Sequence, residues 1–417
     1  MTVGSLQFLV PLLLLTAVFP WVPSVRARQV VLAACNVGFF ATFHPNLATW
    51  LALAAFVGSG YAVGAALRRR PSTALLGGYL VLLVAAFVVL KKYVFLGALL
   101  PPSVLGHAIA VVGLSYMLFR QIHYLVDCRE GQVDGGGLWD YANYQLGFLT
   151  LLAGPIQRFQ EFREYWGRLE PVPRDRHEVL TTWLRILWGV VKLAGLASLF
   201  LLAYDKFHGR LLDKLAATHP HALPVLVLFA GSMYLYPLYM YANFSGYCDV
   251  VIGAAALLGN RLPENFDNPQ LSRNILDFWT RWHRTLGFWI RDYLFMPSYR
   301  WVAERLPRQA PSLAFACYFL AFVIAGVWHG TTANFLAFGI LHGAGASAAK
   351  LYEMFLVKRK GRAWIRQYMK SQRRRAVAIF LCLNYVCFTM LFFADSLGGT
   401  LKLLRGVGAC VAGLAGR

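Results

Sequence analysis

The sequence predicts an all-α polytopic membrane protein. Of its 417 residues, 58% are hydrophobic and only 14% are charged, whereas soluble domains carry roughly 25% charged residues. Apolar runs of about 20 residues, the length that a helix needs to cross a bilayer, recur along the whole chain. The alternation of apolar and polar residues that is typical of outer-membrane barrels is not seen.

The predicted membrane helices follow one another from end to end. We expect about ten to twelve transmembrane or re-entrant helices, because several apolar runs are too short to cross a bilayer. No internal repeat or long linker interrupts them, so residues 1–417 are expected to form a single membrane domain. The candidate runs are residues 5–24, 29–43, 46–67, 73–90, 94–119, 139–153, 178–204, 222–242, 245–260, 311–328, 333–350 and 376–395, with 399–415 as a weaker one.

The first apolar run is expected to stay in the mature protein. No basic residue precedes it, and Arg26 and Arg28 follow it. A cleaved signal peptide shows the opposite order, so the pattern favours a retained first helix with its N-terminus outside the cytoplasm.

The charge distribution predicts which loops face the cytoplasm. Lys and Arg total 40 against 19 Asp and Glu, which gives a net charge of +21. The basic stretches at residues 68–70, 158–177 and 358–375 are the best cytoplasmic loops, because positive residues collect on that side. If residues 125–132 face the same side, the short run before 158–177 is re-entrant. Positive-inside bias together with contact with anionic membrane lipids explains most of the charge, and an acidic or phosphate-bearing partner on the cytoplasmic side is the more specific alternative.

Several classes of function lack their motifs. No zinc-finger, RNP or helix-turn-helix pattern is present, so no nucleic-acid partner is predicted. HExxH and Walker loops are absent, and the nearest match to GxSxG, at residues 242–250, places Ser245 outside an elbow pattern. The 7 cysteines form no CxxC pair and are expected to be small core residues.

Residues 271–296 differ from the membrane runs. Their apolar residues recur at steps of three and four, which places them on one face of a helix. Arginines occupy the other positions, and a helix rich in both Trp and Arg is typical of a membrane interface. We therefore expect one interfacial amphipathic helix here. Its apolar face would contain Ile275, Phe278, Trp282, Leu286, Trp289 and Tyr293.

His329, in the stretch GVWHG, is the main candidate for chemistry. A neutral imidazole can accept a proton from a hydroxyl near pH 7, so a general base is one interpretation. The other interpretation is a core histidine bonded to a backbone carbonyl. Because polar groups inside a membrane are costly and rare, the functional and the structural interpretation have equal weight here. Gly326 and Gly330 would permit close backbone approach or a helix break beside the ring.

Two further histidines carry weaker indications. His283 lies in the stretch RWH, where an interfacial helix can also hold a histidine without a task, and His342 on a glycine-lined run is expected to be a packing residue. His283 and His329 without acidic or thiolate neighbours are a poor zinc site, so no metal is predicted.

The blocks around these histidines resemble the membrane-bound O-acyltransferase family. The combination of RWH and WHG is the strongest part of the likeness, which covers roughly residues 75–395. The sequence is most similar to the bacterial branch that modifies cell-envelope polymers. The matching stretches are residues 114–131, 152–162, 241–259, 265–297 and 326–343.

The resemblance implies a fold and a reaction. Family members resemble a ring of tilted helices around a thinned centre, with a tunnel between a cytoplasmic and an outer funnel. By the resemblance His329 is the catalytic base that deprotonates a hydroxyl acceptor, and His283 is also functionally important. The candidates for lining the tunnel or contacting substrate are Trp328, Gly330, Trp282, Asn334 and Ser245.

The resemblance also implies donors and partners. An acyl carrier protein or coenzyme A would present the acyl thioester on a phosphopantetheine arm, at the cytoplasmic side of a bacterial inner membrane that holds the protein. No cofactor would stay bound. An envelope polysaccharide or teichoic-acid-type polymer would accept it outside, with an extracytoplasmic partner protein. Residues 154–162 and 271–296 lean towards D-alanyl transfer, and acetyl transfer is the alternative. The candidates for docking the donor, with solvated positive-inside charge as the alternative, are Arg281, Arg284, Arg291 and Arg158.

Two other classes of function stay open. Many spans, glycines and basic faces also suit a transporter or flippase of an envelope precursor, although no matched pair of broken helices is seen. A non-catalytic scaffold of an acylation complex is the third hypothesis. Replacement of His329 separates both from the enzyme, because only the enzyme loses acyl transfer.

Overall fold

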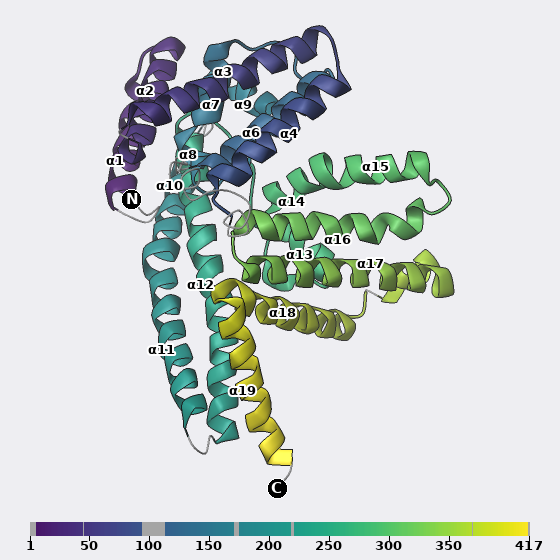
Figure 1. Cartoon of the computed structure of the whole chain (residues 1–417). Helices are drawn as coiled ribbons and strands as arrows, with labels where there is room; N and C mark the ends of the chain where they lie inside the picture. The colour runs from purple at the N-terminus through teal and green to yellow at the C-terminus, as the bar shows by residue number, and fades with distance from the viewer. Residues whose placement is uncertain are drawn as a thin grey trace. The chain divides into compact units, whose positions relative to one another are not determined.

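The computed structural model of the chain is built of helices (Figure 1). It describes residues 6–44, 46–93, 113–170, 175–217, 221–368 and 370–415. Within this part of the chain the regular elements are all helical, and one isolated antiparallel bridge joins Phe266 and Trp282. The predicted all-α class is confirmed. Most of the predicted run 94–119 lies outside the described residues.

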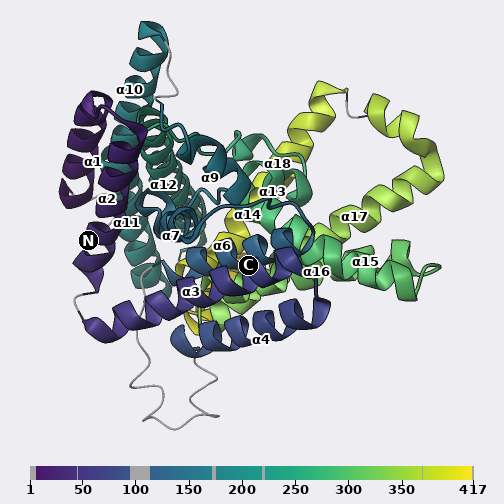
Figure 2. The same ribbon diagram turned by 90° about the horizontal axis from the view of Figure 1, so that it is seen from above.

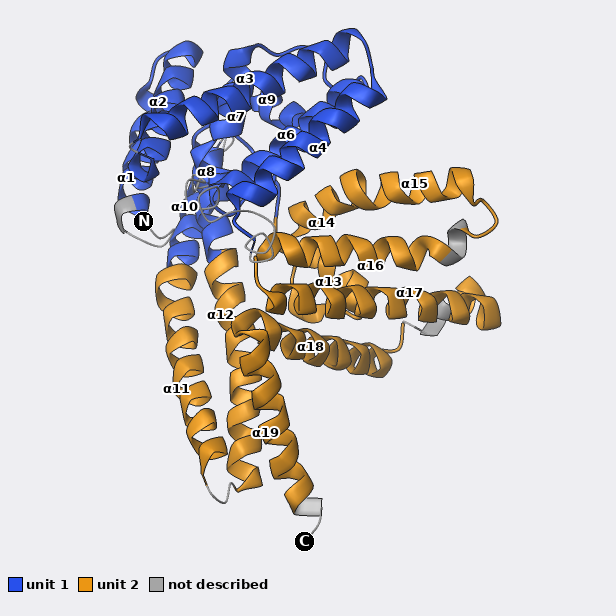
Figure 3. Cartoon of the chain, viewed as in Figure 1, with its two compact units in different colours: residues 1–190, 246–264 blue, residues 191–245, 265–417 orange. Residues whose placement is uncertain are grey.

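The chain divides into two compact units (Figure 3). Unit 1 consists of Met1–Val190 and Gly246–Glu264, and unit 2 consists of Val191–Ser245 and Asn265–Arg417. The single membrane domain and the ring of helices around a tunnel stay predictions.

Unit 1 begins with long helices and continues with short ones. Its helices are α1 (Leu6–Val18), α2 (Val25–Phe43), α3 (Leu47–Arg69), α4 (Thr73–Leu90), α6 (Leu114–Arg129), α7 (Leu138–Leu146), α8 (Phe148–Leu151), α9 (Phe159–Trp166) and α10 (Arg176–Val190), with the short 3₁₀ helix η1 (Phe19–Trp21). The end of α12 (Ala222–Leu257) also belongs to this unit.

Unit 2 contains the remaining helices. They are α11 (Ala197–Ala216), the start of α12, α13 (Ile275–Arg281), α14 (Arg284–Ile290), α15 (Met296–Arg305), α16 (Ala310–His329), α17 (Ala333–Tyr368), α18 (Gln372–Ala394) and α19 (Leu397–Ala415). Two π-helical segments, η3 (Val191–Leu196) and η5 (Arg291–Phe295), and the 3₁₀ turn η4 (Pro269–Leu271) connect them. Figures 1 and 2 both show α16 beside α17.

Five helices of the described chain are long and apolar enough to cross a membrane, which supports a multi-pass membrane protein. They are Leu47–Arg69, Thr73–Leu90, Arg176–Ala216, Ala222–Leu257 and Gln372–Ala394. Two shorter apolar helices are Phe8–Trp21 and Leu313–His329. The run predicted at residues 139–153 forms two short helices, α7 and α8, with a break at Gly147.

Residues 271–296 do not form the single helix that their periodicity predicts. α13 ends at Arg281 and α14 begins at Arg284, because His283 adopts a left-handed backbone conformation with φ of 46°. The predicted apolar face is nevertheless buried at Ile275, Phe278 and Leu286. The periodicity correctly predicted the buried stripe. The prediction of one continuous helix is corrected to two helices, α13 and α14. The interfacial location of this segment stays a prediction.

A hydrophobic cluster packs this broken segment into unit 2. Ile275, Phe278 and Trp279 of α13 lie against Phe338 of α17 and Val386 of α18. Burial of such large side chains contributes about 1.5–3 kcal/mol each. The cluster therefore anchors the polypeptide immediately before His283.

Candidate active site

His329 lies at the C-terminal end of α16 among aromatic rings. The helix ends at this residue, since Gly330 continues in an extended conformation. The half-buried imidazole lies 4.7 Å from the ring of Trp328, 5.3 Å from Phe393 and 6.0 Å from Phe338, measured between centroids. These rings come from α16, α17 and α18, so three helices enclose the histidine.

The glycines beside His329 allow this close packing. A Cβ on Gly326 would lie 2.5 Å from the carbonyl oxygen of Phe335 and 2.6 Å from the Cα of Gly339. A Cβ on Gly330 would overlap the ring of Phe335. Small residues let helix backbones approach closely in membrane proteins. The expected close approach and helix break are both present.

His283 lies in the break between α13 and α14 and is 3% exposed. Its Nδ1 is 3.0 Å from Oδ1 of Asn265, a residue that is itself fully buried. The backbone segments also pair, because the N–H of Arg284 donates to the carbonyl of Asn265 across 2.9 Å. The edge of the His283 ring meets Phe244 at a centroid distance of 4.8 Å.

The two histidines are electrostatically linked. Burial, together with the nearby charge of His329, lowers the pKa of His283 to about 3. Both histidines belong to unit 2. His283 is therefore neutral at physiological pH.

The other predicted tunnel residues make structural contacts in unit 2. The ring of Trp282 stacks on Phe278 at 5.7 Å. Asn334 donates from its amide to the carbonyl of Phe392 across 3.2 Å, and Ser245 accepts a hydrogen bond from Lys192 across 3.2 Å. Lining of a tunnel by Trp328, Gly330, Trp282, Asn334 and Ser245 stays a prediction.

The predicted docking arginines differ in their surroundings. Arg281 pairs with Asp277 at 2.8 Å and Arg291 with Asp292 at 2.7 Å. Burial raises the pKa of Asp277, but hydrogen bonds from the Arg273 N–H and the Arg281 side chain, with both positive charges, bring it below its ordinary value. Arg284, next to His283, has a buried Nε–H without a hydrogen-bond partner. Arg158 precedes α9 and belongs to unit 1.

Sequence reasoning did not find Asn265, Phe338 or Phe393. The indications for Asn265 were its place in NFDNP, before the RWH segment, and at the start of the matching stretch 265–297. Phe338 and Phe393 read as ordinary apolar residues of membrane runs. In the described part of the chain, no group of three or more His, Cys, Asp or Glu residues is arranged to hold a metal ion.

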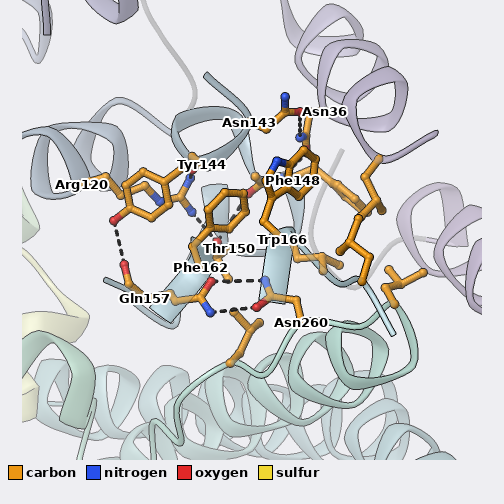
Figure 4. A pocket seen from close by; sticks show the side chains of 16 residues that line it. Asn36, Arg120, Asn143, Tyr144, Phe148, Thr150, Gln157, Phe162, Trp166 and Asn260 are labelled. Atoms are coloured by element: carbon orange, nitrogen blue, oxygen red, sulfur yellow. Dashed lines mark hydrogen bonds between the residues drawn. The ribbon is translucent and has the colours of Figure 1, made fainter. Parts of the chain in front are cut away.

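Unit 1 contains a separate cavity that the sequence did not predict (Figure 4). Its volume is about 50 Å³, and buried polar side chains from distant segments line it. Asn36 and Asn143 are bonded across 3.1 Å, and the amides of Gln157 and Asn260 bond each other at 2.8 and 3.2 Å. Arg120 donates to the carbonyl oxygens of Tyr144 and Gln145, each at 2.8 Å. These bonds connect α2 and α6 to α7, and the segment after α8 to the segment after α12.

A known family matches the region of the chain that holds both histidines. The family model for membrane-bound O-acyltransferases matches residues 111–392. A teichoic acid D-alanyltransferase of Bacillus subtilis is 28% identical over 293 residues, which cover 69% of each chain. A teichoic acid D-alanyltransferase of Streptococcus thermophilus is 28% identical over 69% of this chain and 68% of its own length.

A second group of similar proteins carries a different name. The probable alginate O-acetylase AlgI of Pseudomonas aeruginosa is 30% identical over 247 residues, which cover 58% of this chain and 43% of that protein. All of these proteins are named as acyl-transferring enzymes, and the family model covers more than half of the chain. The chain therefore belongs to the membrane-bound O-acyltransferase family and is an acyltransferase.

Proposed function

We propose that this protein moves a small acyl group from a phosphopantetheine thioester, on the cytoplasmic side of a bacterial inner membrane, to a hydroxyl of an extracytoplasmic envelope polymer. The observation that carries the proposal is the position of His329, at the end of α16 among three aromatic rings and close to a neutral His283. The names of the similar proteins supply the candidate acyl groups, D-alanyl and acetyl, and the candidate polymers.

In the proposed reaction His329 is the general base. It takes the proton of the acceptor hydroxyl while the oxygen attacks the thioester carbonyl carbon. The tetrahedral intermediate expels the thiolate, and the imidazolium of His329 returns the proton to that sulfur. An ester and a free thiol result. Proton transfer to a positioned side chain contributes roughly 10²–10⁴-fold in rate, and alignment of the two substrates supplies the rest.

The surroundings of His329 suit a ring that becomes positively charged during the reaction. The carbonyl groups at the C-terminus of α16 form the negative end of a helix dipole, which favours a cation by about 0.3–1 kcal/mol. His283 stays neutral beside it, so the imidazolium meets no second positive charge there. The aromatic neighbours limit access of water to the ring.

D-alanyl is the first candidate for the acyl group that the protein transfers. This chain spans 69% of the Bacillus subtilis D-alanyltransferase but 43% of the Pseudomonas aeruginosa alginate protein. A D-alanyl thioester on an acyl carrier protein would then be the donor, and a teichoic-acid-type polymer the acceptor. Arg284, whose Nε–H is unpartnered beside His283, is the docking arginine best placed to receive a phosphate or carboxylate of the donor. An extracytoplasmic partner protein would deliver the polymer.

A donor-choice experiment tests the proposal. Purified protein in lipid vesicles receives either D-[¹⁴C]alanyl carrier protein or [¹⁴C]acetyl-coenzyme A, with teichoic acid or alginate as acceptor. We expect label on the polymer from one donor, and a loss of about 10²-fold or more in His329→Ala and His329→Gln. His208→Ala, a histidine stacked on Tyr204 of α11, is the matched control. Full transfer by a folded His329→Ala protein would exclude His329 as the base.

The same preparations separate the other two hypotheses. A transporter would move the envelope precursor across the vesicle without acyl transfer, and replacement of His329 would not change that movement. A scaffold would support acylation only with its partners present, and it too would tolerate His329→Ala.

A further inference from the structure

Asn265 contacts three hydrogen-bonding groups with one oxygen. Its Oδ1 lies 3.0 Å from Nδ1 of His283, 2.9 Å from the hydroxyl oxygen of Thr285 and 3.3 Å from the backbone nitrogen of Thr285. The three residues are 0%, 3% and 6% exposed. Water therefore has little access to this group of contacts, and each polar atom depends on its protein partners.

These contacts determine the orientation of the Asn265 amide. A backbone N–H can only donate a hydrogen bond, so the side-chain atom that faces the N–H of Thr285 is the carbonyl oxygen. The amide nitrogen would place two donors against one another and leave both unsatisfied in a buried site.

The oxygen in turn determines the tautomer of His283. An amide oxygen only accepts hydrogen bonds, so Nδ1 of His283 carries the ring proton and donates it to Oδ1. A neutral imidazole carries a single N–H proton. Since that proton lies on Nδ1, Nε2 has a free lone pair. The backbone reinforces this geometry, because the N–H of Arg284 donates to the backbone carbonyl of Asn265.

We propose that Asn265 is a positioning residue of the acyl-transfer site: it holds the proton of His283 on Nδ1, so that Nε2 serves the site as a hydrogen-bond acceptor. This inference rests on the proposed function. Because burial lowers the pKa of His283 to about 3, this ring is too weak a base to compete with His329 for the proton of the attacking hydroxyl. Nε2 of His283 accepts a hydrogen bond from an O–H or N–H of a substrate and so orients that group. Asn265 influences the reaction only through His283.

A spectroscopic test addresses the tautomer without any activity measurement. Full-length protein labelled with ¹⁵N-histidine gives separate signals for protonated and unprotonated ring nitrogens. The difference between the wild type and His283→Gln assigns the His283 signals. We expect a protonated Nδ1 in the wild type and a shift towards protonated Nε2 in Asn265→Ala. A wild-type ring protonated on Nε2, or an Asn265→Ala protein with an unchanged tautomer, would overturn the proposal.

A conservative variant and a matched control complete the spectroscopic test. Asn265→Asp retains an oxygen acceptor, so it should retain the proton on Nδ1 that Asn265→Ala loses. Asn384→Ala removes another amide that bonds two partners, the hydroxyl of Tyr234 and the carbonyl of Phe380, and should leave the His283 signals in place. A change of tautomer in Asn384→Ala would show that any loss of an amide disturbs the ring.

A double-mutant cycle tests the connection to catalysis. With the labelled donor that the wild type uses, we expect Asn265→Ala to lower kcat by about 10²-fold, as misorientation of a substrate does. Because Asn265 acts through His283, the Asn265→Ala/His283→Gln protein should be no slower than His283→Gln alone. Additive losses would show that Asn265 supports only the fold. Retention of activity by His329→Ala would reject the proposed base, whereas the tautomer measurement would still decide the role of Asn265.

Discussion

Trp279 and His342 are joined by a hydrogen bond in which the indole N–H donates to Nδ1 across 3.2 Å. Because an indole nitrogen only donates, the proton of the His342 ring lies on Nε2. That nitrogen donates to the hydroxyl oxygen of Thr389 across 2.9 Å, and the hydroxyl donates to the carbonyl of Val386. A buried series of hydrogen bonds thus links α13, α17 and α18, in agreement with the packing role expected for His342.

Replacement of His342 should destabilise unit 2. His342→Leu would leave the indole N–H of Trp279 buried without an acceptor and remove the partner of Thr389. Each unsatisfied buried group costs about 1–3 kcal/mol, so we expect a loss of about 2–4 kcal/mol in the free energy of unfolding. Thermal unfolding in detergent measures it. Trp279→Phe removes one donor and leaves one acceptor unpaired, so its loss should be smaller; equal stability of His342→Leu and the wild type would contradict the role assigned to this histidine.

The depressed pKa of His283 predicts a pH dependence of stability. The folded ring stays neutral down to a pH near its pKa of about 3, whereas an unfolded histidine takes up a proton below about pH 6.5. Only the unfolded state gains this proton, so acid favours unfolding, by about 1.4 kcal/mol per pH unit between those two values. The effect vanishes above about pH 6.5.

His283→Gln isolates this contribution from that of other histidines. The variant cannot take up a proton at this position, so its unfolding temperature should fall less steeply than that of the wild type as the pH is lowered from about 6.5 to about 4.5. His208→Gln serves as the control, because this position is outside the candidate site. Parallel pH curves for the wild type and His283→Gln would show that His283 is not held neutral by the fold.

The glycines near His329 should be sensitive to a single methyl group. In Gly326→Ala the new Cβ would meet backbone atoms of α17, which cannot rotate away, so α16 and α17 must separate. We expect a lower unfolding temperature and a loss of transfer activity. Gly330→Ala displaces the ring of Phe335 beside the site, so activity should fall more than stability.

Gly77→Ala is the matched control for these two variants. No atom lies within 4 Å of a Cβ at this position of α4. Alanine also favours the helix by up to about 1 kcal/mol over glycine. We expect unchanged or slightly raised stability and full activity. A neutral result for Gly326→Ala would show that the close approach of α16 and α17 is not required.

Arg120 should be a stability residue of unit 1. It is 3% exposed, and its guanidinium donates to two carbonyl oxygens at the end of α7 and to the hydroxyl of Thr150 (Figure 4). Lysine keeps the charge but lacks the planar fork that reaches several acceptors at once. We expect Arg120→Lys to lower the free energy of unfolding by about 1–3 kcal/mol.

Activity normalised to folded protein distinguishes this role from a direct one. Arg120→Lys should keep the kcat of the folded fraction, because the hydrogen bonds of Arg120 to Tyr144, Gln145 and Thr150 hold unit 1 together. Arg129→Lys, at an exposed hydrogen bond to Thr73, is the control and should be nearly neutral. A large drop in kcat with unchanged stability would assign Arg120 a part in the reaction.

The apolar stripe of residues 271–296 shows how far sequence reasoning reaches. Steps of three and four placed Ile275, Phe278 and Leu286 on one face, and all three are buried. The break at His283 escaped the same reasoning, because it depends on bonds to Asn265, 18 positions earlier in the chain. Periodicity reports which face is apolar, but it does not report which distant segment interrupts the helix.

The amino-acid sequence was enough to predict the all-α membrane class, the family, and the two histidines as candidates. Composition and short motifs suffice for these, since the hydrophobic effect acts on residue type and the RWH and WHG blocks are local. The folded structure was needed to show that Asn265 bonds His283, that three aromatic rings surround His329, and that Gly326 brings α16 against α17. Such contacts join residues far apart in the chain. The distances between these residues are set by the folded backbone, so short sequence motifs do not reveal them.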